Sequence, residues 1–530
     1  MDLHGDFHVY DTTLRDGAQQ EGLNLSVADK LSIARQLDDL GVGYIEGGWP
    51  GANPKDTEFF RRASQELDLR NAKLAAFGAT RRAGLRAADD PGIAALRDSG
   101  AGVVTLVAKS HDRHVDLALR TTLEENLAMI RDTVSHLRAE GQQVFLDAEH
   151  FFDGYRANRD YALEVLRTAY DAGADVIALC DTNGGMLPDW VSDVVHDVVE
   201  TTGVRVGIHC HNDTGCAVAN TLAAVEAGAT HVQGTINGYG ERTGNADLVS
   251  IVANLELKLD RQVLPQGLLR DATRIAHAVA EVTNFPPASR QPYVGTSAFT
   301  HKAGLHASAI KVDPNLYQHM DPVGVGNDMR LLVSDMAGRA SIELKGRELG
   351  FDLSGDKDLV GRITDRVKVL ESRGFTFEAA DASFELLLVE EVEGARPAYF
   401  DVESWRVITE TLPESGPGVE AVSEATVKLN ADGVRFVVTG EGNGPVNALD
   451  AALRTAIVQA YPEVAKFELI DYKVRILDQG HGTDAITRVL IETTDGVSSW
   501  VTVGVGHNVV EASWGALVDG LTFGLRRHHS

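Results

Sequence analysis

YDTTLRDGAQQ, at residues 10–20, begins inside the apolar run His8–Asp11 and ends in a polar, glycine-containing turn. Two later stretches share this arrangement: HCHND at 209–213 and GERTGNA at 240–246, each at the end of an apolar run. Such runs are typical of buried strands. In an α/β barrel the carboxyl ends of all strands open onto one face, where the chemistry takes place. The three stretches therefore predict a barrel with a polar site at its mouth.

Four side chains in these stretches form a set that suits a divalent metal. His209 and His211 are two residues apart, so on a strand both point to the same side. With the carboxylate of Asp16 and the amide of Asn245 they offer mixed oxygen and nitrogen ligands. Taken alone, a His-x-His pair is more often two surface or hydrogen-bonded histidines. Its combination with two other stretches at strand ends favours the metal site.

From His8 to about Leu259 the chain alternates between strand-like and helical segments. The strand-like runs are His8–Asp11, Tyr44–Glu46, Lys73–Phe77, Val103–Ala108, Val144–Asp147, Asp175–Cys180, Val204–Ile208 and His231–Ile236. Amphipathic segments lie between them, including Ser26–Leu40, Thr121–Glu140 and Tyr161–Ala172. Strand–helix units in this number predict a closed (β/α)8 TIM barrel over residues 1–283, with an open doubly wound sheet as the alternative.

The first helix of this region carries its own start and stop signals. Ser26 is placed to cap its amino end, Asp29 occupies the capping-box position, and Gly41 follows its last residue. The glycine-rich turn at 183–185 lacks the Gly-x-Gly-x-x-Gly spacing of a dinucleotide site. We therefore exclude a Rossmann fold.

Two further regions follow the barrel. Residues 284–397 form a mixed, proline-punctuated connecting region that ends in helical segments at Lys357–Ser372 and Glu378–Glu391. Residues 398–527 contain an internal repeat, which predicts a C-terminal α+β domain of duplicated strand–strand–helix modules. The predicted strands are Ala425–Leu429 and Val434–Thr439 in the first module, and Ile486–Glu492 and Ser499–Val503 in the second.

The composition excludes several classes of function. A formal charge of -28 over 530 residues argues against binding to nucleic acid or an anionic membrane, because both require basic patches. Only 3 cysteines are present, which argues for a reducing compartment without disulfides. Neither a signal peptide nor an apolar run of the ~20 residues of a membrane helix is visible. We therefore expect a cytoplasmic protein without a membrane partner.

The three opening stretches resemble the family of acyltransferases and lyases that condenses acetyl-CoA with 2-oxo acids. This family includes the 2-isopropylmalate, homocitrate and citramalate synthases, with hydroxymethylglutaryl-CoA lyase as a relative. VGYIEGGWPGANPKDTEFF at 42–60, DAEHFFDGY at 147–155 and LCDTNGGM at 179–186 are similar to the citramalate synthase branch. The resemblance implies a dimeric acyltransferase of isoleucine biosynthesis, with pyruvate and acetyl-CoA as substrates.

Other functions stay open from the residues alone. 2-Isopropylmalate synthase or another 2-oxo acid acetyltransferase is the nearest alternative, and a lyase of the hydroxymethylglutaryl-CoA type is a more distant one. The C-terminal repeat argues against the lyase, because lyases of this family are expected to lack it. A non-catalytic binding protein on the same scaffold is disfavoured by the complete set of chemical residues. Phe77, Leu106 and Phe145 are candidate walls of the acceptor pocket, by strand position only.

The resemblance also implies roles for individual side chains. The metal, Mg or Mn in preference to Zn or Co, would be held by Asp16, His209 and His211, with Asn245 completing or bordering the shell. Arg15 would bond the developing oxyanion, since a guanidinium is always charged and offers several donors. The remaining residues at the barrel mouth are expected to be an acid, Glu149, and the substrate-binding or arginine-orienting residues Gln19, Glu46 and Thr182.

A base for the methyl group of acetyl-CoA is expected in the connecting region. His306 matches the histidine of the family's Gly-x-His motif, Tyr317 is its expected partner, and His301 is the competing candidate. In the family this region reaches over the barrel of a partner subunit. Ser308 departs from the acid that relatives carry, which affects the orientation of His306. Cys210 is interpreted as a packing residue between the two histidines and not as a nucleophile.

The C-terminal repeat resembles the regulatory domain of the 2-isopropylmalate and citramalate synthases, where amino acids bind at a dimer interface. The resemblance implies feedback by isoleucine and a homodimer or higher oligomer. Gly440, Gly442, Gly504 and Gly506 are the predicted positions where the backbone approaches the effector closely. The alternative is a dimerisation domain that binds no ligand.

Overall fold

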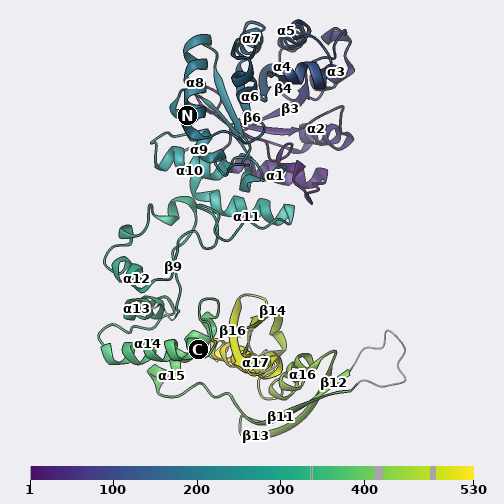
Figure 1. Ribbon diagram of the computed structural model, residues 1–530. Helices are drawn as coiled ribbons and strands as arrows, with labels where there is room; N and C mark the ends of the chain where they lie inside the picture. The colour runs from purple at the N-terminus through teal and green to yellow at the C-terminus, as the bar shows by residue number, and fades with distance from the viewer. Residues whose placement is uncertain (1, 335, 337, 411–421, 478–484, 530) are drawn as a thin grey trace. The chain divides into compact units, whose positions relative to one another are not determined.

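The computed structural model describes residues 2–334, 336, 338–410, 422–477 and 485–529. By its internal contacts the chain divides into two compact units. The first contains Met1–Phe299 and Met320–Asp328, and the second contains Thr300–His319 and Met329–Ser530. Figure 1 shows the first unit in purple to teal and the second in green to yellow, and each is described by itself.

The first unit is built on a closed barrel of eight parallel strands in chain order, with β1 paired to both β2 and β8. This confirms the predicted (β/α)8 barrel and excludes the open sheet. All eight predicted strands are present. They are β1 (His8–Asp11), β2 (Tyr44–Gly48), β3 (Lys73–Ala79), β4 (Val103–Lys109), β5 (Gln143–Glu149), β6 (Val176–Asp181), β7 (Val206–Cys210) and β8 (His231–Gly234).

Helices surround the barrel and fill the connections between its strands (Figure 1). They are α1 (Val27–Leu40), α2 (Pro54–Glu66), α3 (Pro91–Arg97), α4 (Asp112–His114), α5 (Leu123–Ala139), α6 (Phe151–Ala157), α7 (Arg159–Asp171), α8 (Pro188–Thr202), α9 (Ala217–Glu226), α10 (Leu248–Leu257) and α11 (Ala272–Thr283). The predicted caps of α1 are confirmed. Ser26 and Asp29 form a reciprocal capping box, and Gly41 ends the helix with φ of 91°, in the left-handed region that favours glycine.

Successive side chains along each strand point alternately into two apolar cores. Side chains on one face of each strand pack against the helices, whereas Tyr10, Tyr44 and Phe145 help to fill the closed interior of the barrel. Leu106 belongs to the outer core, so its prediction as a wall of the acceptor pocket was wrong. Phe145 lies deep in the interior with 1% exposure. Of the three candidate walls, Phe77 alone is in contact with Arg15 at the mouth.

The second unit begins with short elements around the candidate base. β9 (Thr300–His301) pairs in parallel with β10 (Arg330–Leu331), and α12 (Gly304–Ile310) follows β9 directly. Three longer helices complete this part: α13 (Arg339–Glu348), α14 (Lys357–Ser372) and α15 (Asp381–Glu393). The last two correspond to the predicted helical segments.

The C-terminal part of this unit confirms the predicted duplication and extends it by one strand per module. The first module contains β11 (Phe400–Glu410), β12 (Val422–Ala431), β13 (Val434–Gly442) and α16 (Pro445–Ile457). The second contains β14 (Glu468–Ile476), β15 (Thr487–Thr494), β16 (Ser499–Gly506) and α17 (Val509–His529). Each sheet is antiparallel, and the apolar sides of both modules belong to one shared core.

Two expectations concern the whole described chain. Among its helices none combines the length and the apolar character needed to cross a bilayer. The three cysteines, all among the described residues, are free, and Cys210 is buried in the outer core of the barrel as expected for a packing residue.

Candidate functional site

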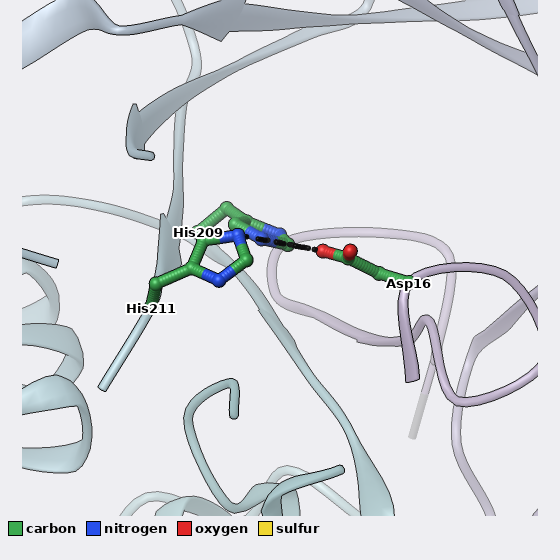
Figure 2. Close-up of side chains that lie close together, drawn as sticks. All are labelled: Asp16, His209 and His211. Atoms are coloured by element: carbon green, nitrogen blue, oxygen red, sulfur yellow. Dashed lines mark ion pairs between the residues drawn. The ribbon is translucent and has the colours of Figure 1, made fainter. Parts of the chain in front are cut away.

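The mouth of the barrel brings Asp16, His209 and His211 together from two distant parts of the chain. Asp16 follows β1 and precedes the 3-10 turn η1 (Gly17–Gln19), His209 lies on β7, and His211 follows that strand. The Nε2 atoms of His209 and His211 lie 3.1 and 3.7 Å from Asp16 Oδ2. Figure 2 shows both imidazoles beside this carboxylate. All three side chains are buried, and one ligand atom from each lies within 4.8 Å of the other two.

The donor set fits a divalent cation. One carboxylate and two imidazoles accept Mg, Mn, Zn or Co, so the identity of the metal is not selected by ligand type alone. Asn245 is 2% exposed and donates through Nδ2 to the Tyr239 carbonyl over 3.0 Å. Its Oδ1 is buried and accepts no hydrogen bond within the part of the chain that the structure describes. A buried acceptor without a donor is costly, and a cation would satisfy it.

The charges around this set keep the carboxylate ionised. Burial alone raises the pKa of Asp16, but Arg15 and His209 outweigh it and hold that pKa well below its usual range. Burial alone lowers the pKa of His209, but the hydrogen bond and charge of Asp16 raise it above its ordinary value. Burial and the charge of His209 lower the pKa of His211 to about 4. At neutral pH the site therefore offers an ionised carboxylate and at least one neutral imidazole.

Behind His209 lies a buried amide, Gln233, that the sequence alone did not single out. Gln233 is fully buried on β8 and accepts from His209 Nδ1 over 2.8 Å. Its Nε2 donates to Asp147 Oδ1 over 2.9 Å. Burial and the nearby Glu46 raise the pKa of Asp147 to about 6. Gln233 thus fixes the tautomer of His209 and leaves Nε2 to face Asp16.

We expect Gln233→Leu to weaken divalent-metal binding by about 10- to 100-fold, because outer partners of metal-binding histidines contribute this much. The substitution removes the acceptor for His209 Nδ1 at similar side-chain volume. Calorimetric titration with Mn2+ measures the effect without an activity assay. Gln142→Leu is the matched control, since Gln142 is also a buried amide but precedes β5 at its amino end. Equal affinities of Gln233→Leu and the unsubstituted protein would contradict this role.

Arg15 is held in place by carboxylates and an aromatic ring. Its Nε donates to Glu46 Oε2 over 2.5 Å, and its guanidinium lies 3.8 Å from the centre of the Phe77 ring. The same group lies 3.5 Å from Asp16 and 4.0 Å from Asp147. Burial alone lowers the pKa of Arg15, but these carboxylates, Glu46 above all, raise it. The side chain keeps 14% exposure, so a charged donor remains available at the mouth.

Glu46 orients this arginine. It is 0% exposed and accepts hydrogen bonds from the Tyr10 hydroxyl, the Thr12 hydroxyl and Arg15 Nε, over 2.7, 2.5 and 2.5 Å. Three donors occupy both of its oxygens. The structure therefore favours the arginine-orienting interpretation of Glu46 over direct contact with a substrate.

Glu149, Thr182 and Gln19 lie in separate surroundings. Glu149 is half-buried and forms an ion pair with Lys109 of the neighbouring strand β4. Thr182 Oγ1 accepts from the backbone N–H of His150 over 2.8 Å. Gln19 is exposed and lines a cavity of about 270 Å3 that Arg15 also lines. Among the described contacts, none links these three directly to Asp16, His209 or His211.

The candidate base lies in the second unit. The rings of His306, on α12, and Tyr317 stack with centroids 4.1 Å apart, and His301 lies 6.0 Å from His306. The predicted pairing of His306 with Tyr317 is thus present. Ser308 Oγ donates to the Gly304 carbonyl of the same helix over 2.9 Å, so Ser308 does not replace an acid beside His306. Leu305 and Leu316 are 74% and 59% exposed.

The four glycines of the repeat have a packing role that the sequence did not indicate. A Cβ added at Gly440 or Gly442 would lie 2.5 or 2.6 Å from backbone atoms of α16. At Gly504 and Gly506 it would lie 1.9 and 2.9 Å from backbone atoms of α17. Because each glycine lacks a side chain, the helix of its own module can pack closely against the strand at that position. This packing accounts for the four glycines without a ligand, and the approach of an amino acid to their backbone stays a prediction.

Two functional side chains were missed, and the strand period could have found them. Asp147 follows the inward-facing Phe145 by two residues on β5 and precedes Glu149 by two. Side chains at this spacing share one face of a strand. Gln233 could have been found in the same way from the carboxyl end of β8. Both lie one layer beneath the mouth, where a polar side chain requires a polar partner.

Three family models together span nearly the whole chain. HMGL-like matches residues 6–279, Homocitrate synthase post-HMGL domain-like matches 293–374, and LeuA allosteric (dimerisation) domain matches 378–525. The (R)-citramalate synthase of Streptomyces coelicolor is 67% identical over 99% of this chain and 98% of its own. That of Aquifex aeolicus is 49% identical over 98% of each chain. The 2-isopropylmalate synthase of Methanocaldococcus jannaschii is 31% identical over 97% of this chain and 94% of its own. The chain belongs to the HMGL-like family, in its (R)-citramalate synthase branch.

Proposed function

We propose that this chain is a citramalate synthase, which condenses acetyl-CoA with pyruvate and hydrolyses the thioester to give (R)-citramalate and CoA. Identity to (R)-citramalate synthases along the full length of both chains is the observation that carries the proposal. The buried set of Asp16, His209 and His211 beside Arg15 supports it, because condensation requires a polarised ketone and a charged donor. The reaction would supply isoleucine biosynthesis.

The acceptor is held at the mouth of the barrel. A divalent cation on Asp16, His209 and His211 would act as a Lewis acid toward the ketone and carboxylate oxygens of the 2-oxo acid. Arg15 donates to the ketone oxygen as negative charge develops there, and Glu46 keeps the guanidinium in position. We assign Thr182 to the substrate carboxylate. Its hydroxyl proton is available for this bond, because its oxygen accepts from His150 N–H.

The donor is activated by a base. His306 removes a proton from the methyl group of acetyl-CoA, and the resulting carbanion attacks the ketone carbon to form the new carbon–carbon bond. The alkoxide takes up one proton in place of the one that His306 removed, and Glu149, the partner of Lys109, is the carboxylate that relays it. Water then adds to the thioester carbonyl, the carbon–sulfur bond breaks, and CoA leaves with a proton on sulfur. Tyr317 holds the ring of His306 by stacking, whichever subunit provides the pair.

The protein is expected to use pyruvate with a kcat/KM at least about 100-fold higher than that for 2-oxoisovalerate. Each extra methyl group in a closed apolar pocket changes the transition-state energy by ~1–3 kcal/mol, and 2-oxoisovalerate carries two more carbons. Coenzyme A release from acetyl-CoA, measured against a panel of 2-oxo acids, gives the ratio. Equal kcat/KM for the two acids would assign the chain to another 2-oxo acid acetyltransferase.

Two alternative functions agree less well with the comparisons. A 2-isopropylmalate synthase uses the same chemistry, but the relative of that name shares only 31% of its residues with this chain. A lyase of the hydroxymethylglutaryl-CoA type would use the barrel alone. The match of residues 378–525 to the LeuA allosteric (dimerisation) domain supports a regulated, oligomeric synthase instead.

We propose a homodimer or higher oligomer that binds isoleucine as its effector through the C-terminal modules. A cavity of about 790 Å3 lies beside the first turn of α16 and strand β14. Asp450 and Arg454 line it with opposite charges and pair over 2.8 Å, while Val446 and Leu469 provide apolar lining. An α-amino acid offers a matching ammonium, carboxylate and aliphatic side chain. We propose this cavity as the site in preference to the four glycines, which pack against helices.

Isoleucine is expected to bind the intact chain, and Asp450→Asn is expected to weaken that binding about tenfold or more, the loss typical of a hydrogen bond to a charged group. Calorimetry with isoleucine and leucine measures both affinities. Asp432→Asn is the matched control, because Asp432 lies in the β12–β13 turn and does not line the cavity. If neither amino acid binds the unsubstituted protein, the C-terminal domain serves assembly alone.

A further inference from the structure

A buried ion pair lies outside the residues considered so far. Lys30 of α1 and Asp56 of α2 are 4% and 6% exposed, and Lys30 Nζ donates to Asp56 Oδ1. Burying two charges costs desolvation energy, and apolar side chains of similar volume are commonly at least as stabilising. Stability alone therefore does not explain why this pair joins the two helices.

The pair binds the backbone at the place where β2 ends. Lys30 Nζ also donates to the Gly47 carbonyl over 3.0 Å, and Asp56 Oδ2 accepts from the Trp49 N–H over 2.9 Å. Between them, Gly48 has φ of +141°, and a Cβ at this position would lie 2.4 Å from the Asp56 carboxyl carbon. One cation and one anion thus fix the carbonyl and the N–H on either side of a single glycine.

Trp49, which follows β2, is linked to Arg15 by a chain of side-chain contacts. The Trp49 ring meets the Phe77 ring edge to face, with centroids 5.4 Å apart. Phe77 also contacts the Arg15 guanidinium, which lies over its ring at 3.8 Å from the ring centre. Arg15 is bound in turn by Glu46, the residue before Gly47. Lys30 and Asp56 therefore act on Arg15 along two routes, through Trp49 and Phe77 and through the end of β2.

We propose that Lys30 and Asp56 are positioning residues for the acceptor site, which set the place of Trp49 and Phe77 and through them the guanidinium of Arg15. Both side chains also border the cavity of about 270 Å3 that Arg15 and Trp49 line, and the proposed role is exerted through the backbone that the pair binds. The pair determines how closely the aromatic wall approaches the alkyl group of the 2-oxo acid, and so contributes to selection of pyruvate against longer acids. This assignment of selectivity rests on the proposed function.

The test compares three variants of the pair in the full-length protein. Lys30→Met leaves Asp56 unpaired, Asp56→Asn removes the charge but keeps an acceptor for Trp49 N–H, and Lys30→Gln with Asp56→Asn restores a neutral hydrogen-bonded pair. Asp38→Asn is the matched control. Asp38 is a buried carboxylate of the same helix α1 that accepts from the N–H groups of residues 70–72, at the opposite end of the barrel.

We expect Lys30→Met and Asp56→Asn to lower kcat/KM for pyruvate by about 10- to 100-fold, the loss caused by displacement of a catalytic group by about 1 Å. The ratio of kcat/KM for pyruvate to that for 2-oxobutanoate is expected to fall about tenfold, since one methylene is then discriminated less well. The double variant should recover most of both losses. Asp38→Asn should leave the ratio unchanged even if it lowers the unfolding temperature.

A second readout does not depend on activity. With 5-fluorotryptophan the chain gives signals from 5 tryptophans, and Trp49→Phe assigns that of Trp49. This signal should shift in Lys30→Met and Asp56→Asn but not in Asp38→Asn. An unchanged selectivity ratio and an unchanged Trp49 signal in a folded Asp56→Asn variant would overturn the proposal. If the unsubstituted protein does not use pyruvate but the Trp49 signal shifts as expected, the proposed function fails and the positioning role stands.

Discussion

His209→Ala and His211→Ala are each expected to lower the rate of condensation by more than about 10³-fold, the equivalent of the several kcal/mol that a Lewis acid supplies. Each change removes one of three ligand groups that lie within 4.8 Å of one another. Asp16→Asn should have the same effect, because the amide carries no charge to offset that of the cation. Metal content of the purified variants and CoA release with pyruvate measure the two consequences separately.

Chelator treatment of the unsubstituted protein should also abolish condensation, and Mg or Mn should restore it. Neither metal in excess is expected to rescue the histidine variants. His196→Ala is the matched control, because His196 is an exposed histidine of α8 whose contact is an ion pair with Glu200. Full activity in a protein freed of metal would contradict the assignment of these ligands.

His306→Ala is expected to slow exchange of the acetyl-CoA methyl protons with solvent by about 10²- to 10⁴-fold, the usual contribution of a positioned general base. Metal affinity should stay unchanged, because His306 lies in the second unit and the metal ligands lie in the first. Exchange followed by proton NMR in deuterated buffer isolates this step from carbon–carbon bond formation. His301→Ala is the control, and a larger loss in that variant would make His301 the base.

The connecting region is expected to act in a partner subunit, and subunit exchange tests this. His306→Ala mixed with Asp16→Asn should recover about one quarter of the unsubstituted activity in a dimer, because half of the dimers are mixed and each holds one complete site. Exchange of subunits is verified by mass spectrometry of labelled chains. A mixture as inactive as its parents after verified exchange would place the base and the metal in one subunit.

The fold of the barrel could be predicted because its signals are local. Each strand of the barrel is a short apolar run, and the helix after β1 carries its capping box at Ser26 and Asp29. The meeting of Asp16, His209 and His211 could be predicted for the same reason, since strand ends converge at one face. Leu106 shows the limit of this argument. The strand is buried without a break over residues 103–106, so apolar character alone does not reveal which face turns inward.

The first strand of each C-terminal module was missed because a bulge interrupts its alternation. The register shifts between Val402 and Ser404 in β11, and between Leu469 and Asp471 in β14. A single extra residue reverses the alternation of inward and outward side chains, so neither segment shows a continuous period of two. The two bulges occupy corresponding places in the repeat.

Contacts between distant strands account for the other omissions. Gln233 gains its role from His209 on β7 and Asp147 on β5, and Lys30 gains its role from Asp56 on another helix. No sequence pattern joins these residues, because the closed barrel and its helices create the contacts. The glycines of the repeat illustrate the same limit, since their need for space depends on the helix that packs against them.

The most direct test of the central claim is identification of the product. Acetyl-CoA labelled with 13C at the methyl carbon is incubated with pyruvate and a divalent metal, and the products are separated by chiral chromatography and analysed by NMR. We predict (R)-citramalate with the label in its methylene group, formed in equal amount with free CoA and absent after chelation. Release of CoA without a new carbon–carbon bond, or product formation that is unaffected by chelation, would contradict the account.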